Sequence, residues 1–507
     1  MHGISVAALS RHATFGDAVM ASLWRIALAL LLCAFAIRAV QFGNPVIHID
    51  EQFYLLVGDR IWLGDWPFVD SWDRKPIGLF LLYAAIRRLG GDGILAYQVV
   101  AALFAGATAF VIQRIAATVA SARAALTAGI LYLLLLMANG GDGGQAPVFY
   151  NLLVALTAWI VVRLFDVPNQ RAALGRACVA MGLVGVSLQI KYTVVFEGIY
   201  FGLVLIGLLY RGGARRIIRI TLLLIAVALL PTFVALLAYT IAGHGDAFIF
   251  ANFVSIFARP RSMSDDAIPR LLHILFATSP VVLLTIMSVV FRRAWPAGRY
   301  RSLLLGWSGA AVVGLLIFGT YHDHYALALL VPLSVCSAPV LNVERWGRAL
   351  GFVTIAASLA IGTMVLARNP ARRDMGSAVE NIAARVRPHA GDGLFVFSGQ
   401  PVLYYWTGAR PPTPFHFPTL LSEARDAATM GVDPLVELDR VMQGQPRFVV
   451  SRDGGFAEVL PTAWQRMAMF LRSDYCLVGI HRLRHRTMML YEHRLYRNGA
   501  ASCWRVA

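Results

Sequence analysis

The sequence predicts a polytopic α-helical membrane protein that ends in a small α/β domain, and three observations carry this prediction. Hydrophobic residues make up 58% of the 507 residues and charged residues only 14%, which is too apolar for a soluble globular protein of this size. The apolar residues gather in runs of about 20, the length of helix that crosses a bilayer. After about residue 368, the long runs give way to short ones separated by turn residues, as in a folded α/β domain.

Eleven runs are long enough to cross the membrane. Their ranges are 21–40, 94–117, 122–138, 147–165, 174–190, 193–210, 217–241, 270–291, 302–319, 324–341 and 348–367. The first run has no convincing small-residue cleavage site, so we expect a retained helix rather than a signal peptide. The run 77–89 is short and suits a re-entrant or interfacial helix, so we expect about 11 to 13 transmembrane helices.

Basic residues set the orientation and account for the net charge of +17. Lys and Arg are distributed between the apolar runs rather than gathered in a DNA-reading motif, so we expect no nucleic-acid partner. With a cytoplasmic N-terminus every inner loop is basic, whereas the outer loops at 140–144 and 321–324 lack Lys and Arg. We therefore expect a multi-pass protein of the inner (plasma) membrane, with a transmembrane domain over 1–367 and a periplasmic or extracellular domain over 368–507.

The C-terminal domain is expected to contain both strands and helices. Turn residues bound short apolar segments, which predicts strands at 394–398 and 447–451 and helices at 378–386 and 434–442. Cys476 and Cys503 also fall in this domain. They either form a disulfide or stay free, and the sequence favours neither.

The long outer loop, 41–93, carries an acid pair, Asp50 and Glu51. One interpretation is structural, because Asp is a good helix N-cap and Glu suits a first turn. The other is catalytic, because a carboxylate near the hydrocarbon is costly unless it is hydrated, paired or used. In that case Asp50 would take a proton from an acceptor hydroxyl as a general base.

A helix is expected directly after the acid pair, over 52–62. Its apolar residues recur at helical spacing, which suits an interfacial helix that lies along the membrane surface; a helix packed within the loop fits nearly as well. Trp62, Trp66 and Trp72 follow among charged residues, as in membrane-interface belts.

Two adjacent cations, Arg74 and Lys75, stand just before the apolar run at 77–89. Arg as a bidentate fork and Lys as a point charge can together neutralise a phosphate. The alternative is an anchor that snorkels to the interface. These cations lie on the predicted outer side of the membrane, where the positive-inside rule does not require basic residues.

With these features, the chain resembles a known family, the GT-C superfamily of polyprenyl-phosphate-sugar-dependent glycosyltransferases. The resemblance rests on the Asp50-Glu51 pair, the Leu63-Gly64-Asp65-Trp66 segment, Lys75-Pro76, and the many helices before an outer domain. It is greatest with the branch that contains the aminoarabinose transferase of lipid A and protein O-mannosyltransferases. It implies that Asp50 is the base or acceptor-positioning carboxylate and that Lys75 holds the lipid-linked phosphate.

The sequence departs from that family at two places. Arg74 stands where the branch has an acid that contributes to a metal site, so we expect no required cofactor and keep a divalent metal as an alternative. Gln145-Ala146-Pro147 occupies the place of an acid before the fourth helix, which leaves Asp142 as the nearest substitute.

Several other polar residues are candidates for the same cavity. His322, Asp323 and His324 have metal-ligand side chains at poor spacing and otherwise suit a cavity lining or a phosphate contact, while Tyr325 stands where the family often has a His-Tyr. Lys191 either faces the cavity or anchors at the interface paired with Glu197. Arg259 and Arg261 either bind phosphate or lie in a solvated loop.

The sequence-based hypothesis is an inverting hexosyl- or pentosyltransferase. It would move a sugar from polyprenyl (undecaprenyl) phosphate to a lipid, glycan or protein of the cell envelope, with membrane lipids around it. Arg74 and Lys75 would stabilise the departing phosphate. One alternative is a transporter or flippase of lipid-linked or small polar substrates, supported by Lys191 and the many helices, although no repeat of two halves is visible. Another is a non-catalytic scaffold that binds partners through residues after about 370.

Overall fold

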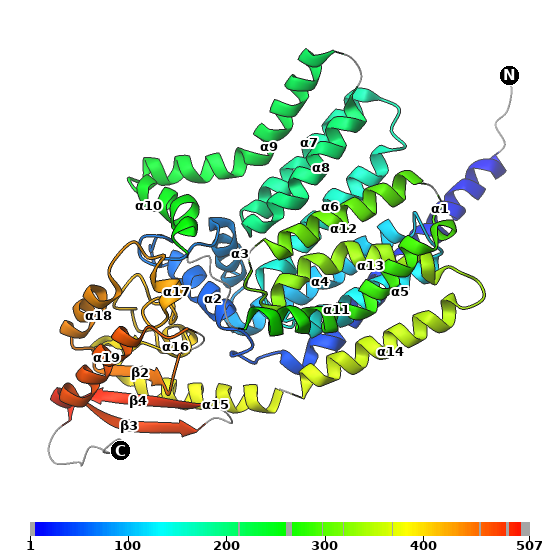
Figure 1. The fold of residues 1–507 in the computed structure, drawn as a ribbon. Coiled ribbons are helices and arrows are strands. Elements are labelled where there is room, and N and C mark those ends of the chain that lie inside the picture. Colours follow the sequence, from blue (N-terminus) through cyan, green and yellow to red (C-terminus); the bar gives the residue numbers. More distant parts are fainter. Residues whose placement is uncertain are drawn as a thin grey trace.

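The computed structural model describes residues 6–210, 213–259, 266–296, 298–317, 319–367, 369–455, 458–482 and 486–497. Most of the chain in these ranges is helical, and a small sheet forms near the C-terminus (Figure 1). Cys503 and Arg261 lie outside these ranges, so the pairing of Cys503 with Cys476 and the role of Arg261 stay predictions.

Each of the eleven predicted membrane runs forms a helix. These helices are α1 Val6–Arg38, α4 Gly93–Ala116, α5 Ala122–Ala138, α6 Ala146–Leu164, α7 Gln170–Leu188, α8 Val195–Leu209, α9 Ala214–Ile241, α11 Ala267–Val290, α12 Gly298–Leu316, α13 Leu327–Leu341 and α14 Gly347–Leu366. Within the described ranges, nine spans are long and apolar enough to cross a membrane by themselves. The other two predicted spans, α5 and α12, pack against α13 in the same bundle.

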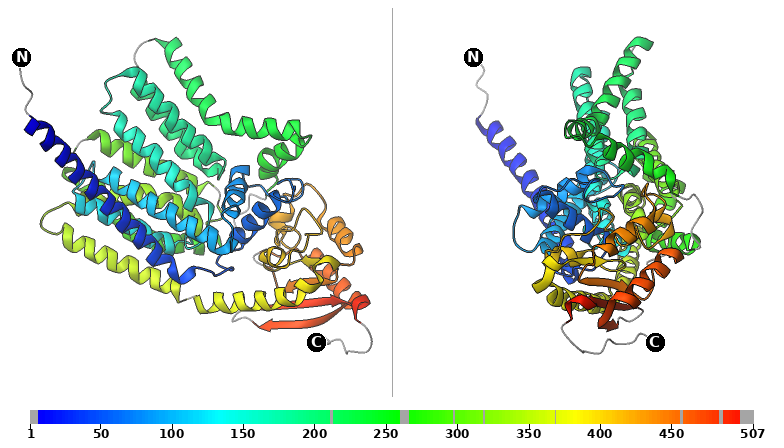
Figure 2. Two further views of the ribbon diagram at one scale, coloured as in Figure 1. Left: turned by 180° about the vertical axis from the view of Figure 1, so that it is seen from behind. Right: turned by 90° about the vertical axis from the view of Figure 1, so that its left-hand side faces the viewer.

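The loops of the bundle meet at two opposite ends. At one end, Arg299 pairs with Asp166 at 3.3 Å, so loops that the sequence predicts to be cytoplasmic lie together. At the other end lie the long loop after α1, the loop between α5 and α6, and the residues after α14. Figures 1 and 2 show the C-terminal unit, defined as the described residues from 369 onward, at this second end.

The C-terminal unit is built around a four-stranded sheet in the order β1-β2-β4-β3. Its strands are β1 Leu394–Val396, β2 Phe448–Arg452, β3 Tyr475–Arg482 and β4 Thr487–His493, and its helices are α15 Asn369–Val386, α16 Val402–Thr407, α17 Ala424–Ala427, α18 Pro434–Gln443 and α19 Pro461–Asp474. Strands β1 and β2 are parallel, and β4 pairs antiparallel with β2 and β3. Alternate strand residues therefore face α15 and α16 on one side and α18 and α19 on the other.

Two short helices of the outer loop, α2 Ile49–Ile61 and α3 Ile77–Arg87, lie between the bundle and the C-terminal unit (Figure 1). With 11 residues, α3 is about 16 Å long and too short to cross a bilayer. Both helices pack closely, because a side chain at Gly58 of α2 would lie 2.7 Å from the backbone of Ala84 in α3.

The expectation that residues 52–62 lie on the membrane surface is wrong for most of this helix. Phe53, Leu56 and Val57 are buried to 2% exposure or less, and Gln52 Nε2 donates to Gln400 of the C-terminal unit at 2.7 Å. Trp72 is buried too, whereas Trp62 keeps 49% of its surface exposed. The alternative of a packed helix is correct, because α3 and the C-terminal unit together cover the apolar face, as the ring contacts of Phe53 with Phe80 and Phe417 show.

Candidate active site

The structure brings the two ends of the polar loop together. Asp50, in the first turn of α2, lies with Oδ1 3.3 Å from Nζ of Lys75, just before α3. Lys75 Nζ also donates to Asp73 Oδ2 at 2.8 Å, and it lies 5.2 and 5.3 Å from the ring centroids of Tyr54 and Phe417. The ammonium group is therefore held between two carboxylates and two aromatic faces.

The charges of this pair are mutually stabilised. Burial by itself would raise the pKa of Asp50, but Lys75, helped by His324 and Gln145, lowers that pKa below its ordinary value. Burial would lower the pKa of Lys75, but Asp73 and Asp50 raise it above its ordinary value. At neutral pH the site therefore holds a carboxylate and an ammonium ion in contact.

The loop between α5 and α6 supports Asp50 from the bundle side. Gln145 Nε2 donates to Asp50 Oδ2 at 3.4 Å. Gln145 thus contacts Asp50 from the bundle side of the site. Close packing requires glycine at two positions of this loop. A Cβ atom at Gly143 would lie 2.0 Å from the carboxylate of Glu51, and a Cβ atom at Gly144 would lie 2.4 Å from the hydroxyl of Tyr83.

Asp142 lies in this loop but does not face the Asp50–Lys75 contact. It is 1% exposed and pairs with His48 at 3.0 Å and with Arg372 of α15 at 2.5 Å, while Gln41 donates to it at 3.0 Å. Burial by itself would raise the pKa of Asp142, but His48 and Arg372 lower it. Asp142 therefore joins the bundle, the outer loop and the C-terminal unit.

Substituting Asp142 with Asn should destabilise the protein by about 3 kcal/mol, because removal of one partner from a buried ion pair leaves the other charge uncompensated. Thermal unfolding in detergent measures this loss. The matched control is Asp166→Asn, whose pair with Arg299 is half exposed and should matter by less than about 1 kcal/mol. Equal stability of the two variants would contradict the joining role of Asp142.

Glu51 occupies a different environment from its neighbour Asp50. Its exposure is 0%, and its side chain points into the interior against Gly143. Burial raises the pKa of Glu51 to about 7. The structure therefore separates the acid pair into a partly accessible Asp50 and an enclosed Glu51, and the enclosed position favours a structural role for Glu51.

The raised pKa of Glu51 predicts a pH-dependent stability. The unfolded chain releases this proton near pH 4.5 and the folded protein near 7, so stability should fall by about 3 kcal/mol as pH rises between these values. Glu51→Gln, which stays neutral, should unfold at a higher temperature than the wild type at pH 8 and at a similar one at pH 5. The control Glu380→Gln changes an exposed acid of α15 and should show no such pH difference. An unaltered pH dependence in Glu51→Gln would refute the assignment.

The predicted cavity candidates from the bundle lie around Asp50. Lys191, between α7 and α8, has Nζ 4.5 Å from the ring centroid of Tyr325, and burial lowers its pKa. Asp50 interacts electrostatically with Lys191, His322 and His324. Glu197 does not make the expected pair with Lys191. Its carboxylate instead accepts a hydrogen bond from Trp307 Nε1 at 2.6 Å.

The histidines of this cluster are arranged as a stack. The rings of His322 and His324 are parallel with centroids 5.8 Å apart, and the ring of Tyr325 lies edge-on to both. Burial lowers the pKa of His322 to about 4, so this ring is neutral at neutral pH. Asp323 turns away and lies 3.9 Å from His273. Among the described residues no three His, Cys, Asp or Glu side chains gather as a metal site, and metal dependence stays a prediction.

Arg74 and Arg259 are already engaged by the C-terminal unit. Arg74 donates to Asp426 Oδ1 at 2.8 Å, and Arg259 lies 3.7 Å from the same oxygen. Both guanidinium groups lower the pKa of Asp426 against the opposing effect of burial. Lys75 is therefore the cation of this pair that faces Asp50, while Arg74 fastens the loop to α17.

Three further residues shape the site without a motif in the sequence that marks them. Asp73 is one of several acids in the loop. His48 is marked only by its position before the acid pair, and Phe417 lies in a part of the chain that carries no motif. A short sequence distance from Lys75 was a usable signal for Asp73. Phe417 is brought to Lys75 by tertiary structure alone.

The structure is that of a polytopic helical membrane protein, and its fold is similar to that of solved structures of ArnT. The chain superposes on the crystal structure of ArnT from Cupriavidus metallidurans bound to undecaprenyl phosphate with a TM-score of 0.59 and 15% sequence identity, over 93% of this chain and 98% of ArnT. For ArnT in the apo state the TM-score is 0.60, with 14% identity over 94% of this chain and 98% of ArnT. No protein-family model and no curated protein sequence matches the chain.

Proposed function

We propose that this protein is a membrane glycosyltransferase that moves a sugar from a polyprenyl phosphate to an acceptor outside the cytosol. The observation that carries the proposal is the 3.3 Å contact between Asp50 and Lys75, which places a carboxylate beside a cation in a site shared by the bundle and the outer loop. The likeness to ArnT bound to undecaprenyl phosphate supports a polyprenyl-phosphate donor.

Lys75 and Lys191 would receive the phosphate of the donor. Both cations interact electrostatically with Asp50 and with each other, so an anion placed between them relieves their repulsion. As the anomeric carbon loses the phosphate, negative charge develops on the leaving oxygen. A cation in a partly buried site stabilises that charge more strongly than bulk water does.

Asp50 would take the proton of the acceptor hydroxyl. The carboxylate is ionised at neutral pH, with Oδ2 held by Gln145 and Oδ1 in contact with Lys75, so Oδ1 can face an acceptor once the donor phosphate engages Lys75. Attack on the anomeric carbon from the side opposite the phosphate inverts its configuration. A single carboxylate suffices, because a phosphate leaves without a protonating acid.

The direct test is turnover of a polyprenyl-phosphate sugar by the purified protein in the presence of membrane lipid and acceptor extracts. We expect release of polyprenyl phosphate together with a covalent sugar product. Movement of the lipid-linked sugar across proteoliposomes without a covalent product would contradict the proposal and support a transporter.

A further inference from the structure

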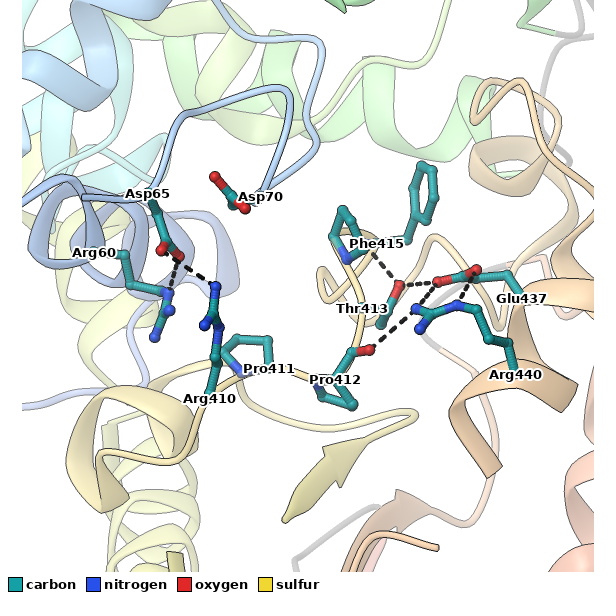
Figure 3. A pocket seen from close by; sticks show the side chains of 11 residues that line it. Arg60, Asp65, Asp70, Arg410, Pro411, Pro412, Thr413, Phe415, Glu437 and Arg440 are labelled. Carbon is teal, nitrogen blue, oxygen red and sulfur yellow. Dashed lines mark hydrogen bonds and ion pairs between the residues drawn. The ribbon is translucent and has the colours of Figure 1, made fainter. Parts of the chain in front are cut away.

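A second polar pocket, distinct from the Asp50–Lys75 contact, opens between the outer loop and the C-terminal unit. Its volume is about 430 Å³, within the usual range of small-molecule sites of about 300 to 1,000 Å³. Figure 3 shows the charged residues of its lining. They are Arg60, Asp65, Asp70, Arg410, Glu437 and Arg440.

The lining carries three guanidinium groups and three carboxylates, and most of them are paired inside the pocket. Asp65 accepts from Arg60 at 2.5 Å and lies 3.7 Å from Arg410, and Glu437 accepts from Arg440 at 2.6 Å. The pocket therefore presents no net charge. An anionic ligand would have to displace a carboxylate from its arginine, whereas a hydroxyl group can donate to the carboxylates and accept from the guanidinium groups without breaking a pair.

The wall formed by the C-terminal unit is rigid and partly apolar. Pro411, Pro412 and Pro414 lie in it, and their rings fix the backbone angle φ. The side chain of Phe415 adds an aromatic surface that can cover the C–H face of a sugar ring. A preformed wall binds a ligand with less loss of conformational entropy.

Both walls of the pocket lead directly to the candidate active site. On one side Phe415 is two residues from Phe417, whose ring contacts Lys75, so the two positions are at most about 7 Å apart along the chain. On the other side the outer loop continues from Asp70 to Lys75. The two walls are joined where Trp72 donates its backbone N–H to the carbonyl of Pro414 at 2.9 Å.

We propose that this pocket binds a neutral, hydroxyl-rich glycan portion of the acceptor while another hydroxyl of the acceptor reaches Asp50. The inference rests on the proposed function, because that function defines the acceptor. Binding of the glycan itself does not require transfer. It assigns the specificity for the acceptor to the junction between the outer loop and α18.

The test is titration of the purified full-length protein, without donor, with neutral trisaccharides of glucose, mannose or N-acetylglucosamine and with an anionic trisaccharide of galacturonic acid. At least one neutral trisaccharide should bind at millimolar concentration or below. Two variants should weaken it tenfold or more: Arg410→Ala, which removes a side chain that is 74% exposed, and the double variant Glu437→Gln with Arg440→Gln.

The matched control is Arg466→Ala. It removes an exposed arginine of α19 that lies 3.5 Å from Asp439 of α18 and does not line the pocket, so binding should stay unchanged. The inference is overturned if no neutral trisaccharide binds, if the pocket variants bind as the wild type does, or if the anionic trisaccharide binds more tightly. Loss of transfer with binding retained would instead count against the proposed function.

Discussion

Asp50→Asn is expected to lower the rate of sugar transfer by about 10² to 10⁴-fold, because an amide of the same shape cannot accept the proton of the acceptor. The fold should persist, since Lys75 keeps its 2.8 Å contact with Asp73. Donor binding should be as tight as in the wild type or tighter, because the phosphate no longer competes with the carboxylate of Asp50 for Lys75. Initial rates at saturating donor, together with a donor-binding titration, measure both effects.

Asp59→Asn is the matched control, because Asp59 lies on the same helix and pairs with Arg87 at 2.9 Å away from Lys75. Its transfer rate should stay within about twofold of the wild type. A near-wild-type rate in Asp50→Asn would show that Asp50 is not the base.

Lys75→Ala is expected to lower transfer by about 10² to 10³-fold, because the developing charge on the phosphate loses its nearest cation. Donor affinity should fall as well. The residual activity should also respond differently to pH. Without Lys75, burial raises the pKa of Asp50, so the acidic limb of the pH–rate profile should move to higher pH.

Arg74→Gln separates the two neighbouring cations. Arg74 is engaged with Asp426 at 2.8 Å, so this variant should loosen the loop from α17 and lower the unfolding temperature while transfer falls by less than about tenfold. If a folded Arg74→Gln variant lost as much transfer as Lys75→Ala, Arg74 would have to contact the phosphate.

The helices of the bundle could be predicted from the sequence because a membrane-spanning helix forms its backbone hydrogen bonds internally and is recognisable as a long apolar run. The two predicted strands of the C-terminal unit also formed, as β1 and β2. The strands β3 and β4 and the helix α19 were not predicted. Basic residues at 482, 484 and 486 separate the short apolar runs of the two strands, and β4 also pairs with β2, which is distant in the sequence.

The candidate site was predictable only in part. Asp50 and Lys75 are only 25 positions apart, which is short enough for a loop to bring them together. Their charged side chains in an otherwise apolar region mark both as candidates. Arg74, Gln52 and Asp142 each have a partner in the C-terminal unit that lies 230 to 352 positions away. A local pattern shows that a helix has an apolar face, but it does not show whether lipid or another part of the protein covers that face. For this reason the sequence leaves open whether α2 lies on the membrane surface or packs within the protein.

Under the proposed function, the contact between Asp50 and Lys75 makes the donor bind before the acceptor is activated. While Lys75 contacts Asp50, it lowers the pKa of the carboxylate and keeps it a weak base. A phosphate that binds Lys75 draws the ammonium away from the carboxylate, and burial then raises the proton affinity of Asp50. The base becomes strong only after the donor is loaded, so acceptor activation follows donor binding. An unloaded enzyme is thereby kept from deprotonating an acceptor that has no sugar to receive.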